Sequence, residues 1–221
     1  KPVGRLEEVL RDLRSLLDHG VMADGGVGRM GLPLEAEGRG SPPLWVAGHG
    51  PRMLRLTGRY GDGWIPAWWM TPEEYGEKRA VIAAHAEEAG RPAPTNSLLP
   101  FCLFAESRDA AAEMFENEPL GKLFGLFAMG HMWEAHGLRH PLGNDSKGFI
   151  DVVIHGLDAD DLRDIAPTIP FEMVCEVLFV GNADELATQF EAYARNGLEH
   201  VVLANITGVV GGMDEIMARA M

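Results

Sequence analysis

The sequence predicts an α/β fold built from parallel βα units. Short apolar runs alternate along the chain with longer segments in which apolar residues recur at helical spacing. Several helical segments begin at capping residues and end at glycine. Hydrophobic residues make up 46% of the 221 residues, enough for a sizeable core. Strands that alternate with helices pair in parallel, because each helix returns the chain to the same end of the sheet.

The first half of the chain predicts a helix, a long glycine-rich loop and two βα units. In order, we expect a helix over 6–20, a loop over 21–41, a strand over 44–47, a helix over 52–60, a strand over 64–68 and a helix over 71–90. Thr71-Pro72-Glu73-Glu74 is a strong helix start, with an N-cap threonine, proline in the first turn and glutamate three residues after the cap.

The sequence of the second half predicts further alternation of strands and helices on both sides of an irregular stretch. We expect a strand over 98–105, helices over 109–116 and 120–129, an irregular stretch over 130–157 with a candidate strand at 149–154, short helices over 158–165 and 170–177, a helix over 182–197, a strand over 200–204 and a helix over 213–221. The helix that follows Asn182 begins at a variant of the capping box and ends at Asn196-Gly197.

The net charge of −14 argues against nucleic acid or an anionic membrane as a partner. A bound anion must then be held locally, by backbone amides and one or two basic side chains. No apolar run reaches the ~18 residues of a membrane span, and no signal peptide is visible. We expect a cytoplasmic protein in which Cys102 and Cys175 are buried free thiols.

A glycine-rich turn is the leading candidate for a binding site. It follows the strand over 44–47, and a phosphate can bind where such a turn leads into a helix. Glycine lets the backbone approach the anion closely, and the helix offers free N–H groups and its dipole. The alternative is an ordinary strand-to-helix turn without a ligand. The candidate residues are Ala47, Gly48, His49, Gly50, Pro51 and Arg52.

Other residues that suggest chemistry favour structural roles. We interpret Asp62-Gly63 as a turn in which the aspartate bonds the local backbone, rather than as a catalytic acid. Trp64, Trp68 and Trp69 suit ring stacking on a ligand or packing, and the last two are the better ligand candidates.

The histidines do not predict a metal site. His136 and His140 are four residues apart, but Gly137 lies between them and Pro141 follows, so one helix holding both is not expected. We therefore predict no metal. His155 is a weak candidate for the substrate side.

Two segments resemble the luciferase-like superfamily of flavin- and deazaflavin-dependent oxidoreductases. The first, from Pro43 to Ile65, has a strand, a turn with Gly-Pro, a helix with Leu-x-x-Gly, and then Asp-Gly-Trp-Ile. The second begins at Val180-Gly-Asn-Ala-Asp-Glu-Leu-Ala and runs through Gly197-Leu-Glu-His-Val-Val-Leu203. Within the superfamily, the chain is most similar to the branch that uses the deazaflavin coenzyme F420.

The resemblance implies a TIM (β/α)8 barrel of the bacterial-luciferase-like type. Residues 1–221 would be a single domain that forms the C-terminal portion of this barrel, with a variable insertion at about 119–178. The N-terminal strands, and with them the catalytic acid or base, would lie before Lys1. No catalytic residue is therefore assigned.

The implied activity is hydride transfer between reduced F420 and a small organic substrate such as a ketone. The turn at 47–52 would contact the phosphate-bearing tail of the cofactor. An FMN-dependent luciferase-like monooxygenase is the alternative on the same fold. A non-catalytic truncated barrel that binds a ligand or forms oligomers is the alternative from another class. Because a partial barrel leaves sheet edges open, we expect a homo-oligomer.

Overall fold

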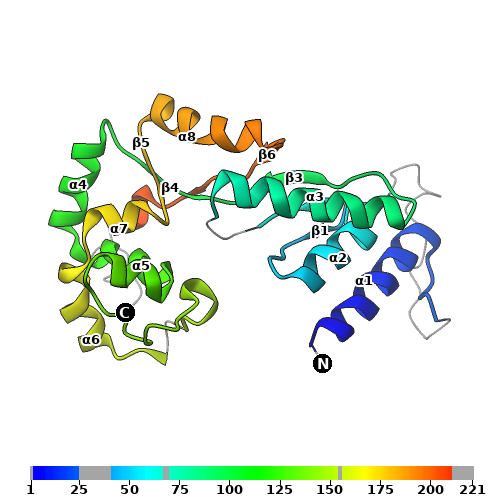
Figure 1. Ribbon diagram of the computed structural model, residues 1–221, viewed down its shortest axis with the longest axis horizontal. Helices are drawn as coiled ribbons and strands as arrows, with labels where there is room; N and C mark the ends of the chain where they lie inside the picture. The colour runs from blue at the N-terminus through cyan, green and yellow to red at the C-terminus, as the bar shows by residue number, and fades with distance from the viewer. Residues whose placement is uncertain (1, 25–40, 67–69, 154–155, 211–221) are drawn as a thin grey trace. The chain divides into compact units, whose positions relative to one another are not determined.

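The chain divides into two compact units, each of which contains a parallel sheet (Figure 1). Unit 1 is Lys1–Leu98 with Tyr193–Val201, and unit 2 is Leu99–Ala192 with Val202–Met221. The computed structural model describes residues 2–24, 41–66, 70–153 and 156–210. Trp68, Trp69, His155, the helix over 213–221 and most of the loop over 21–41 lie outside the described residues. The description of the chain as one domain with an insertion stays a prediction.

Unit 1 has a four-stranded parallel sheet in the order β1-β2-β3-β6. Its elements are α1 (Pro2–His19), β1 (Trp45–Val46), α2 (Pro51–Tyr60), β2 (Gly63–Trp64), α3 (Pro72–Glu88), β3 (Thr95–Leu98) and β6 (His200–Val201). The expected capping box is present, because the Thr71 hydroxyl accepts from the Glu74 amide while the Glu74 carboxylate accepts from the Thr71 amide.

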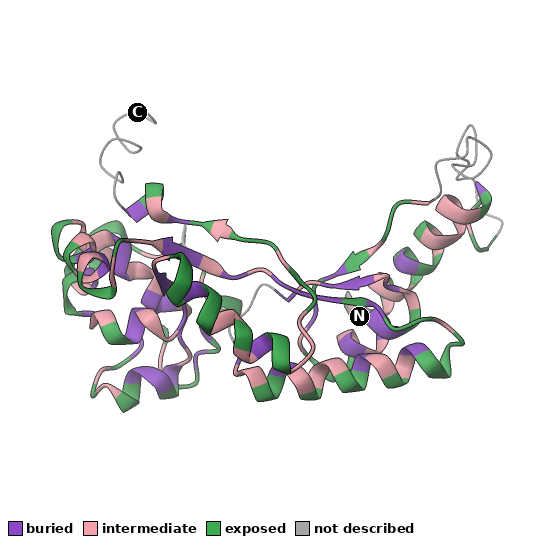
Figure 2. Cartoon of the chain, turned by 90° about the horizontal axis from the view of Figure 1, so that it is seen from above, coloured by how far each residue is buried: buried purple, intermediate pink, exposed green. Residues whose placement is uncertain are grey.

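Helices cover one face of this sheet. Val46 packs with Leu10 of α1 and Leu56 of α2, and all three are buried. The buried positions follow the strands and the inward helix faces (Figure 2). Gly58 lets α2 approach α3 closely, since a Cβ at this position would lie 2.4 Å from the carbonyl oxygen of Ile82.

The other face of the sheet is concave. The rings of Trp45 on β1 and His200 on β6 have centroids 5.5 Å apart, although these strands lie at opposite edges of the sheet. In a flat sheet the two strands would be separated by three spacings of about 4.8 Å each. Gly63 makes room for the Trp45 ring, which lies 2.4 Å from where a Cβ on Gly63 would be. The sheet is therefore strongly curved, as the strands of a barrel are.

Unit 2 places β4 between two parallel neighbours, in the order β5-β4-β7. The strands are β4 (Phe101–Phe104), β5 (Phe179–Gly181) and β7 (Ala204–Asn205). The helices are α4 (Arg108–Asn117), the 3-10 helix η2 (Pro119–Phe127), α5 (Gly130–Ala135), η3 (Gly148–Ile150), α6 (Ala159–Ile165), η5 (Ala166–Thr168), α7 (Phe171–Cys175), α8 (Ala183–Arg195, whose last residues belong to unit 1) and α9 (Thr207–Val210). None of the described helices combines the length and the hydropathy needed to cross a bilayer.

Four of the predicted elements in the second half need correction. The strand over 98–105 is broken into β3 and β4 at Leu99-Pro100, where proline has no N–H to donate. The strand over 200–204 is likewise two short strands, because β6 pairs with β3 and β7 pairs with β4. Residues 120–129 form a 3-10 helix over most of their length. The candidate strand at 149–154 begins instead as η3, which Gly148 enters with φ +59°.

The thiols are free, and burial differs between them. Cys102 on β4 is fully buried, which raises its pKa to about 12. Cys175 is half-buried rather than buried, and desolvation raises its pKa to about 11.

Candidate functional site

The turn over 47–50 connects the carboxyl end of β1 to the first residue of α2. Gly50 is the N-cap, with φ −80° and ψ 157°, and Pro51 occupies the first helical position. The Gly50 carbonyl accepts from the amides of Met53 at 2.9 Å and Leu54 at 3.0 Å. No side chain caps the helix, and its first turn carries no acidic residue. The sequence placed this turn correctly at a strand end that leads into a helix.

Three backbone N–H groups in this turn and in the first turn of α2 are available to a ligand. Within the described part of the chain, no group accepts a hydrogen bond from the amides of His49, Gly50 or Arg52. A Cβ on Gly50 would meet nothing within 4 Å, so the space beside it is open. Free amides at the start of a helix, together with the helix dipole, favour an anion.

His49 adds an unsatisfied polar atom to the turn. Its Nδ1 is shielded from solvent, yet it has no hydrogen-bond partner among the described residues. Buried polar atoms are normally paired, so an orphan of this kind fits a site that a ligand completes. Burial lowers the pKa of His49, and the nearby charge of Lys78 lowers it further. The imidazole is therefore neutral at pH 7.

Sequence reasoning missed Lys78. This lysine lies on α3, about thirty residues after the turn in the chain, and α3 packs against α2 through Gly58. Its influence on the pKa of His49 shows that its charge acts on the turn. Nothing in the sequence around Lys78 distinguishes it from other helical lysines, so only the packing of the two helices identifies it.

Trp64 contacts the turn from the buried core. Its indole Nε1 donates to the Gly48 carbonyl at 2.8 Å, and its ring stacks on Tyr75 with centroids 4.9 Å apart. Trp64 is completely buried, so it packs in the core rather than stacking on a ligand. Gly48 itself is required by packing, since a Cβ there would lie 2.7 Å from the Met53 Cβ.

Asp62 lies at the amino ends of the strands, opposite the turn. Its carboxylate accepts hydrogen bonds from Arg14, from Arg91 at 2.8 Å and from the Leu44 amide at 2.8 Å. Burial alone would raise the pKa of Asp62, but these hydrogen bonds and the two arginine charges outweigh it and lower the pKa. Asp62 therefore has a structural role, but its partners are not the local backbone that the sequence predicted: the amide is that of Leu44, and the two arginines lie in distant segments of the chain.

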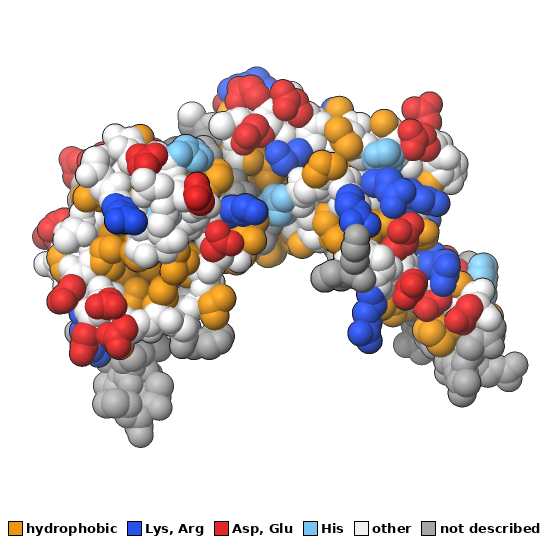
Figure 3. Space-filling view, turned by 60° about the horizontal axis from the view of Figure 1, so that its bottom comes forward, with side chains coloured by type: hydrophobic (Ala, Val, Ile, Leu, Met, Phe, Trp, Pro, Cys, Tyr) orange, Lys and Arg blue, Asp and Glu red, His pale blue; other side chains and the backbone are white. Residues whose placement is uncertain are grey.

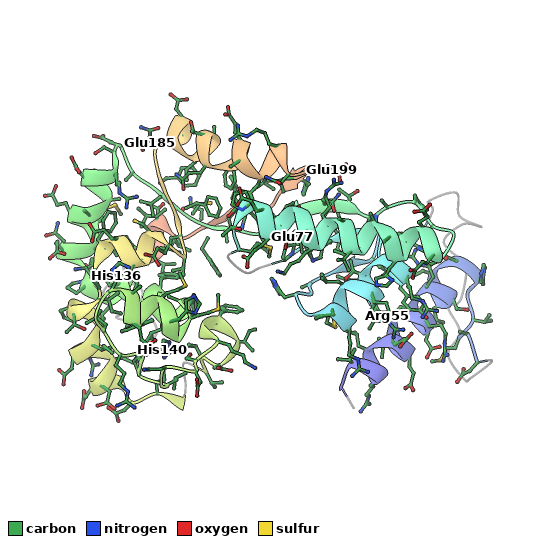
Figure 4. The ribbon with its side chains drawn as sticks, viewed as in Figure 1. Arg55, Glu77, His136, His140, Glu185 and Glu199 are labelled. Carbon is green, nitrogen blue, oxygen red and sulfur yellow. The ribbon has the colours of Figure 1, made fainter. Side chains whose placement is uncertain are left out.

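The histidines of unit 2 do not converge (Figure 4). His136 contacts the carboxylate of Glu176 at 2.8 Å. His140 is buried, its Nε2 donates to the Leu126 carbonyl at 3.1 Å, and its Nδ1 accepts from the Leu142 amide at 3.0 Å. Within the described ranges, no group of three or more potential ligands is placed to hold a metal ion.

Comparison with known proteins identifies a family and several relatives. The model of the family described as luciferase-like monooxygenase matches residues 1–200. The phthiodiolone/phenolphthiodiolone dimycocerosates ketoreductase of Mycobacterium tuberculosis H37Rv is 33% identical over 223 residues, which cover 93% of this chain and 56% of the relative. The 5,10-methylenetetrahydromethanopterin reductase of Methanolobus tindarius is 24% identical over 170 residues, which cover 74% of this chain and 52% of the relative. The chain thus spans about half the length of the curated relatives it matches.

Two solved structures confirm the predicted fold class. The coenzyme F420 dependent tetrahydromethanopterin reductase from Methanopyrus kandleri matches with a TM-score of 0.61 at 16% identity, covering 95% of this chain and 61% of the other. An F420-dependent secondary alcohol dehydrogenase in complex with an F420-acetone adduct matches with a TM-score of 0.57 at 16% identity. The match covers 99% of this chain and 62% of the other. At this level of identity, the likeness concerns the fold.

Proposed function

This chain belongs to the luciferase-like monooxygenase family, and on that premise we propose that its turn at Ala47–Arg52 holds the phosphate-bearing tail of a flavin-type cofactor in an oxidoreductase. The observation that carries the proposal is the set of free amides at His49, Gly50 and Arg52 beside the open space at Gly50. These amides would bind the phosphate oxygens, while Lys78 and Arg52 would add positive charge. The overall charge of −14 makes such local donors necessary.

We further propose that the cofactor is F420 and that the acceptor is a carbonyl compound. The names of the relatives support this, since one is a ketoreductase and two solved neighbours are named for F420. The cofactor itself supplies the hydride. The residues of this chain would fix its position: Trp64 and Tyr75 hold the turn in place, and Asp62 anchors the other end of the same strands.

FMN is the competing cofactor, because the family description names a monooxygenase. Titration of the intact protein with each cofactor separates the two. Tight binding of F420 with weak binding of FMN supports the proposal, and the reverse result replaces F420 by FMN at the same turn. Failure of both to bind contradicts the assignment of the turn.

A matched pair of variants tests the turn itself. Gly50→Asp and Gly50→Asn have nearly the same shape, and both side chains are good N-caps, so both should preserve α2. Only aspartate places a negative charge where the phosphate would lie. Two unit charges about 4 Å apart near a protein surface interact with about 4 kcal/mol. The aspartate variant should therefore bind the cofactor at least tenfold more weakly than the asparagine variant, as measured by calorimetry.

The salt dependence is the internal control for that comparison. The difference between the two variants should shrink as ionic strength rises, because screening weakens a charge effect but leaves shape effects unchanged. Equal affinity of the two variants at low salt would place the phosphate elsewhere.

A further inference from the structure

The concave face of the unit 1 sheet presents an indole ring with one open side. Three atoms of the six-membered ring of Trp45 lie 2.4–2.7 Å from where a Cβ on Gly63 would be. Distances this similar to three neighbouring ring atoms place that point over the face of the ring, so the indole lies flat on β2. Its opposite side faces away from the sheet, and Trp45 keeps 36% of its surface exposed. An exposed aromatic face is a surface on which another flat ring can stack.

His200 lies beside this indole. The two ring centroids are 5.5 Å apart and the planes make an angle of 60°, so a ring stacked on Trp45 would meet the imidazole at its rim. His200 is exposed, and within the described part of the chain its ring nitrogens have no hydrogen-bond partner. A neutral imidazole donates from one nitrogen and accepts at the other, so it can bond either kind of polar atom on such a rim.

The register of the strands places this pair beside the proposed cofactor turn. Trp45 of β1 lies at the level of Thr95 of β3, because both residues pair with the same glycine of β2. Ser97, two residues further along β3, pairs with His200. Counted across the sheet, His200 is therefore level with Ala47, the first residue after β1. Residues in register share a face of the sheet, and so do residues two positions apart on a strand, which puts His200 on the same, concave side as Trp45.

The strands give this side of the sheet no carboxylate, ammonium or guanidinium group. Lys and Arg side chains gather on the surface of unit 1 in Figure 3, but the four strands of its sheet contain no Asp, Glu, Lys or Arg. Besides the imidazole, the strands add only the hydroxyls of Thr95 and Ser97 to this side, and the Ser97 hydroxyl is used within the sheet, where it donates to the Trp64 carbonyl. Binding here therefore depends on stacking and hydrogen bonds rather than on ion pairs.

We propose that Trp45 and His200 form a subsite for a flat heteroaromatic ring, which stacks on the open side of the indole and hydrogen-bonds the imidazole. The inference rests on the proposed function in one respect, since the ring is assigned to the cofactor whose phosphate would bind the turn. In barrel enzymes, ligands bind at the carboxyl ends of the strands, and His200 is level with that end of β1. The sequence does not predict this pair, because only the curvature of the sheet brings its two edge strands together.

Riboflavin and 5-deazariboflavin are the probes, because each carries the ring and its sugar-alcohol chain but no phosphate. Both are titrated into the intact protein, and the quenching of their own fluorescence measures the affinity. Trp45→Leu keeps an apolar side chain but removes the stacking surface, so it should weaken both probes roughly fivefold or more, the lower end of what stacking a base on an aromatic side chain contributes. Trp45→Phe, which keeps an aromatic ring, should weaken them less. Absence of binding by both probes to the wild type, or equal affinity of Trp45→Leu and the wild type, would overturn the proposal.

The imidazole is tested by a second set of variants. His200→Phe removes the hydrogen bond and keeps a flat ring, so it should weaken both probes roughly threefold to tenfold, whereas His200→Gln keeps an amide that donates and accepts and should restore most of the affinity. Glu199→Gln is the matched control on the preceding residue, which is labelled in Figure 4. Glu199 lies on the other side of the strand, where its carboxylate accepts from the backbone and side-chain amides of Asn96, and glutamine keeps an acceptor there. The control should change the affinity less than twofold; a loss equal to that of His200→Phe would assign the effect to the strand rather than to the imidazole.

A substitution at an exposed position keeps the test decisive if Trp45→Leu does not fold. Thr95 is exposed and lies on the same side of the sheet, level with Trp45. Thr95→Trp should extend towards the indole, occupy the space in front of it and weaken both probes about tenfold or more, with thermal melting close to that of the wild type. A folded Thr95→Trp variant that binds riboflavin like the wild type would contradict the subsite.

Comparison with FMN keeps the two proposals apart, because FMN adds a phosphate to riboflavin. The difference between Gly50→Asp and Gly50→Asn should appear with FMN and be absent with riboflavin, while the Trp45 and His200 variants should weaken both ligands equally. If only the Gly50 pair responds, the ring subsite is wrong and the turn stands. If only the Trp45 and His200 variants respond, the turn is wrong and the ring subsite stands.

Discussion

Replacing Trp64 by phenylalanine removes the hydrogen bond that fixes the Gly48 carbonyl, and it should both destabilise the fold and weaken cofactor binding. The bond is 2.8 Å long and buried, and no other described residue donates to this carbonyl. Leaving a buried acceptor unpaired costs about 1–3 kcal/mol. The smaller ring also leaves a gap beside Tyr75, which adds about 1 kcal/mol.

The expected loss in the free energy of unfolding is therefore about 2–4 kcal/mol. For a chain of this length, each kcal/mol lowers the melting temperature by about 2–4 °C, so calorimetry should show a decrease of roughly 4–16 °C. Cofactor affinity, measured below the transition, should fall as well, because the turn loses the contact that holds it in place.

Trp133→Phe is the matched control in unit 2. The Trp133 indole donates to a buried glycine carbonyl as well, that of Gly125 at 3.1 Å, but this carbonyl also accepts from the Ala128 amide at 3.0 Å. The control should therefore cost less stability than Trp64→Phe and leave cofactor affinity unchanged. If Trp64→Phe melts like the wild type, or if both variants weaken cofactor binding equally, the role assigned to Trp64 is wrong.

Further predictions concern packing and pH. Gly58→Ala should cost about 1–3 kcal/mol in thermal unfolding, since its Cβ meets the backbone of Ile82, whereas Gly4→Ala in open space on α1 should stabilise by about 0.5–1 kcal/mol. The pKa of His140 is lowered, chiefly by burial. Its stabilising contribution is therefore complete above pH ~6.5 and declines as the pH falls below that value; His140→Gln should flatten the melting temperature between pH 8 and 5.5. The pKa of Asp62 is lowered too, so its contribution is present above pH ~3.9 and is lost on further acidification; Asp62→Asn should remove that acid-induced step, and an unchanged step would assign it to other carboxylates.

Local signals made the helix starts predictable from the sequence. The Thr71 capping box and the Asn182–Glu185 pair (Glu185 is labelled in Figure 4) both form as expected, because each depends on residues three positions apart. The position of the turn at 47–50 was predictable for the same reason. It follows an apolar run and precedes a proline that suits the first helical position.

The features that could not be predicted from the sequence depend on contacts between residues that are far apart in the chain. The apolar run over 98–105 satisfies every local rule for one strand, yet its two halves pair with different partners on either side of Pro100. The apolar content of 120–129 predicts a helix, but residues 119–127 form the tighter 3-10 helix. Gly125 packs there so closely against Ile169 that a Cβ would lie 2.7 Å from its side chain, a contact that the sequence does not reveal. Lys78 could not be found at all, because its link to the turn exists only through helix packing.

The Asp-Gly-Trp segment that carries part of the family resemblance has a structural explanation that involves no catalysis. Asp62 ties the amino ends of β1 and β2 to Arg14 and Arg91, while Gly63 leaves room for the Trp45 ring on the concave face. Trp64 reaches the other end of the same strands and fixes the Gly48 carbonyl. In barrel enzymes, the amino ends of the strands serve stability and the carboxyl ends serve chemistry. Three consecutive residues therefore connect the stabilising end to the end that we propose binds the cofactor, so a substitution at Trp64 should change both stability and cofactor affinity, while a substitution at Asp62 should change stability alone.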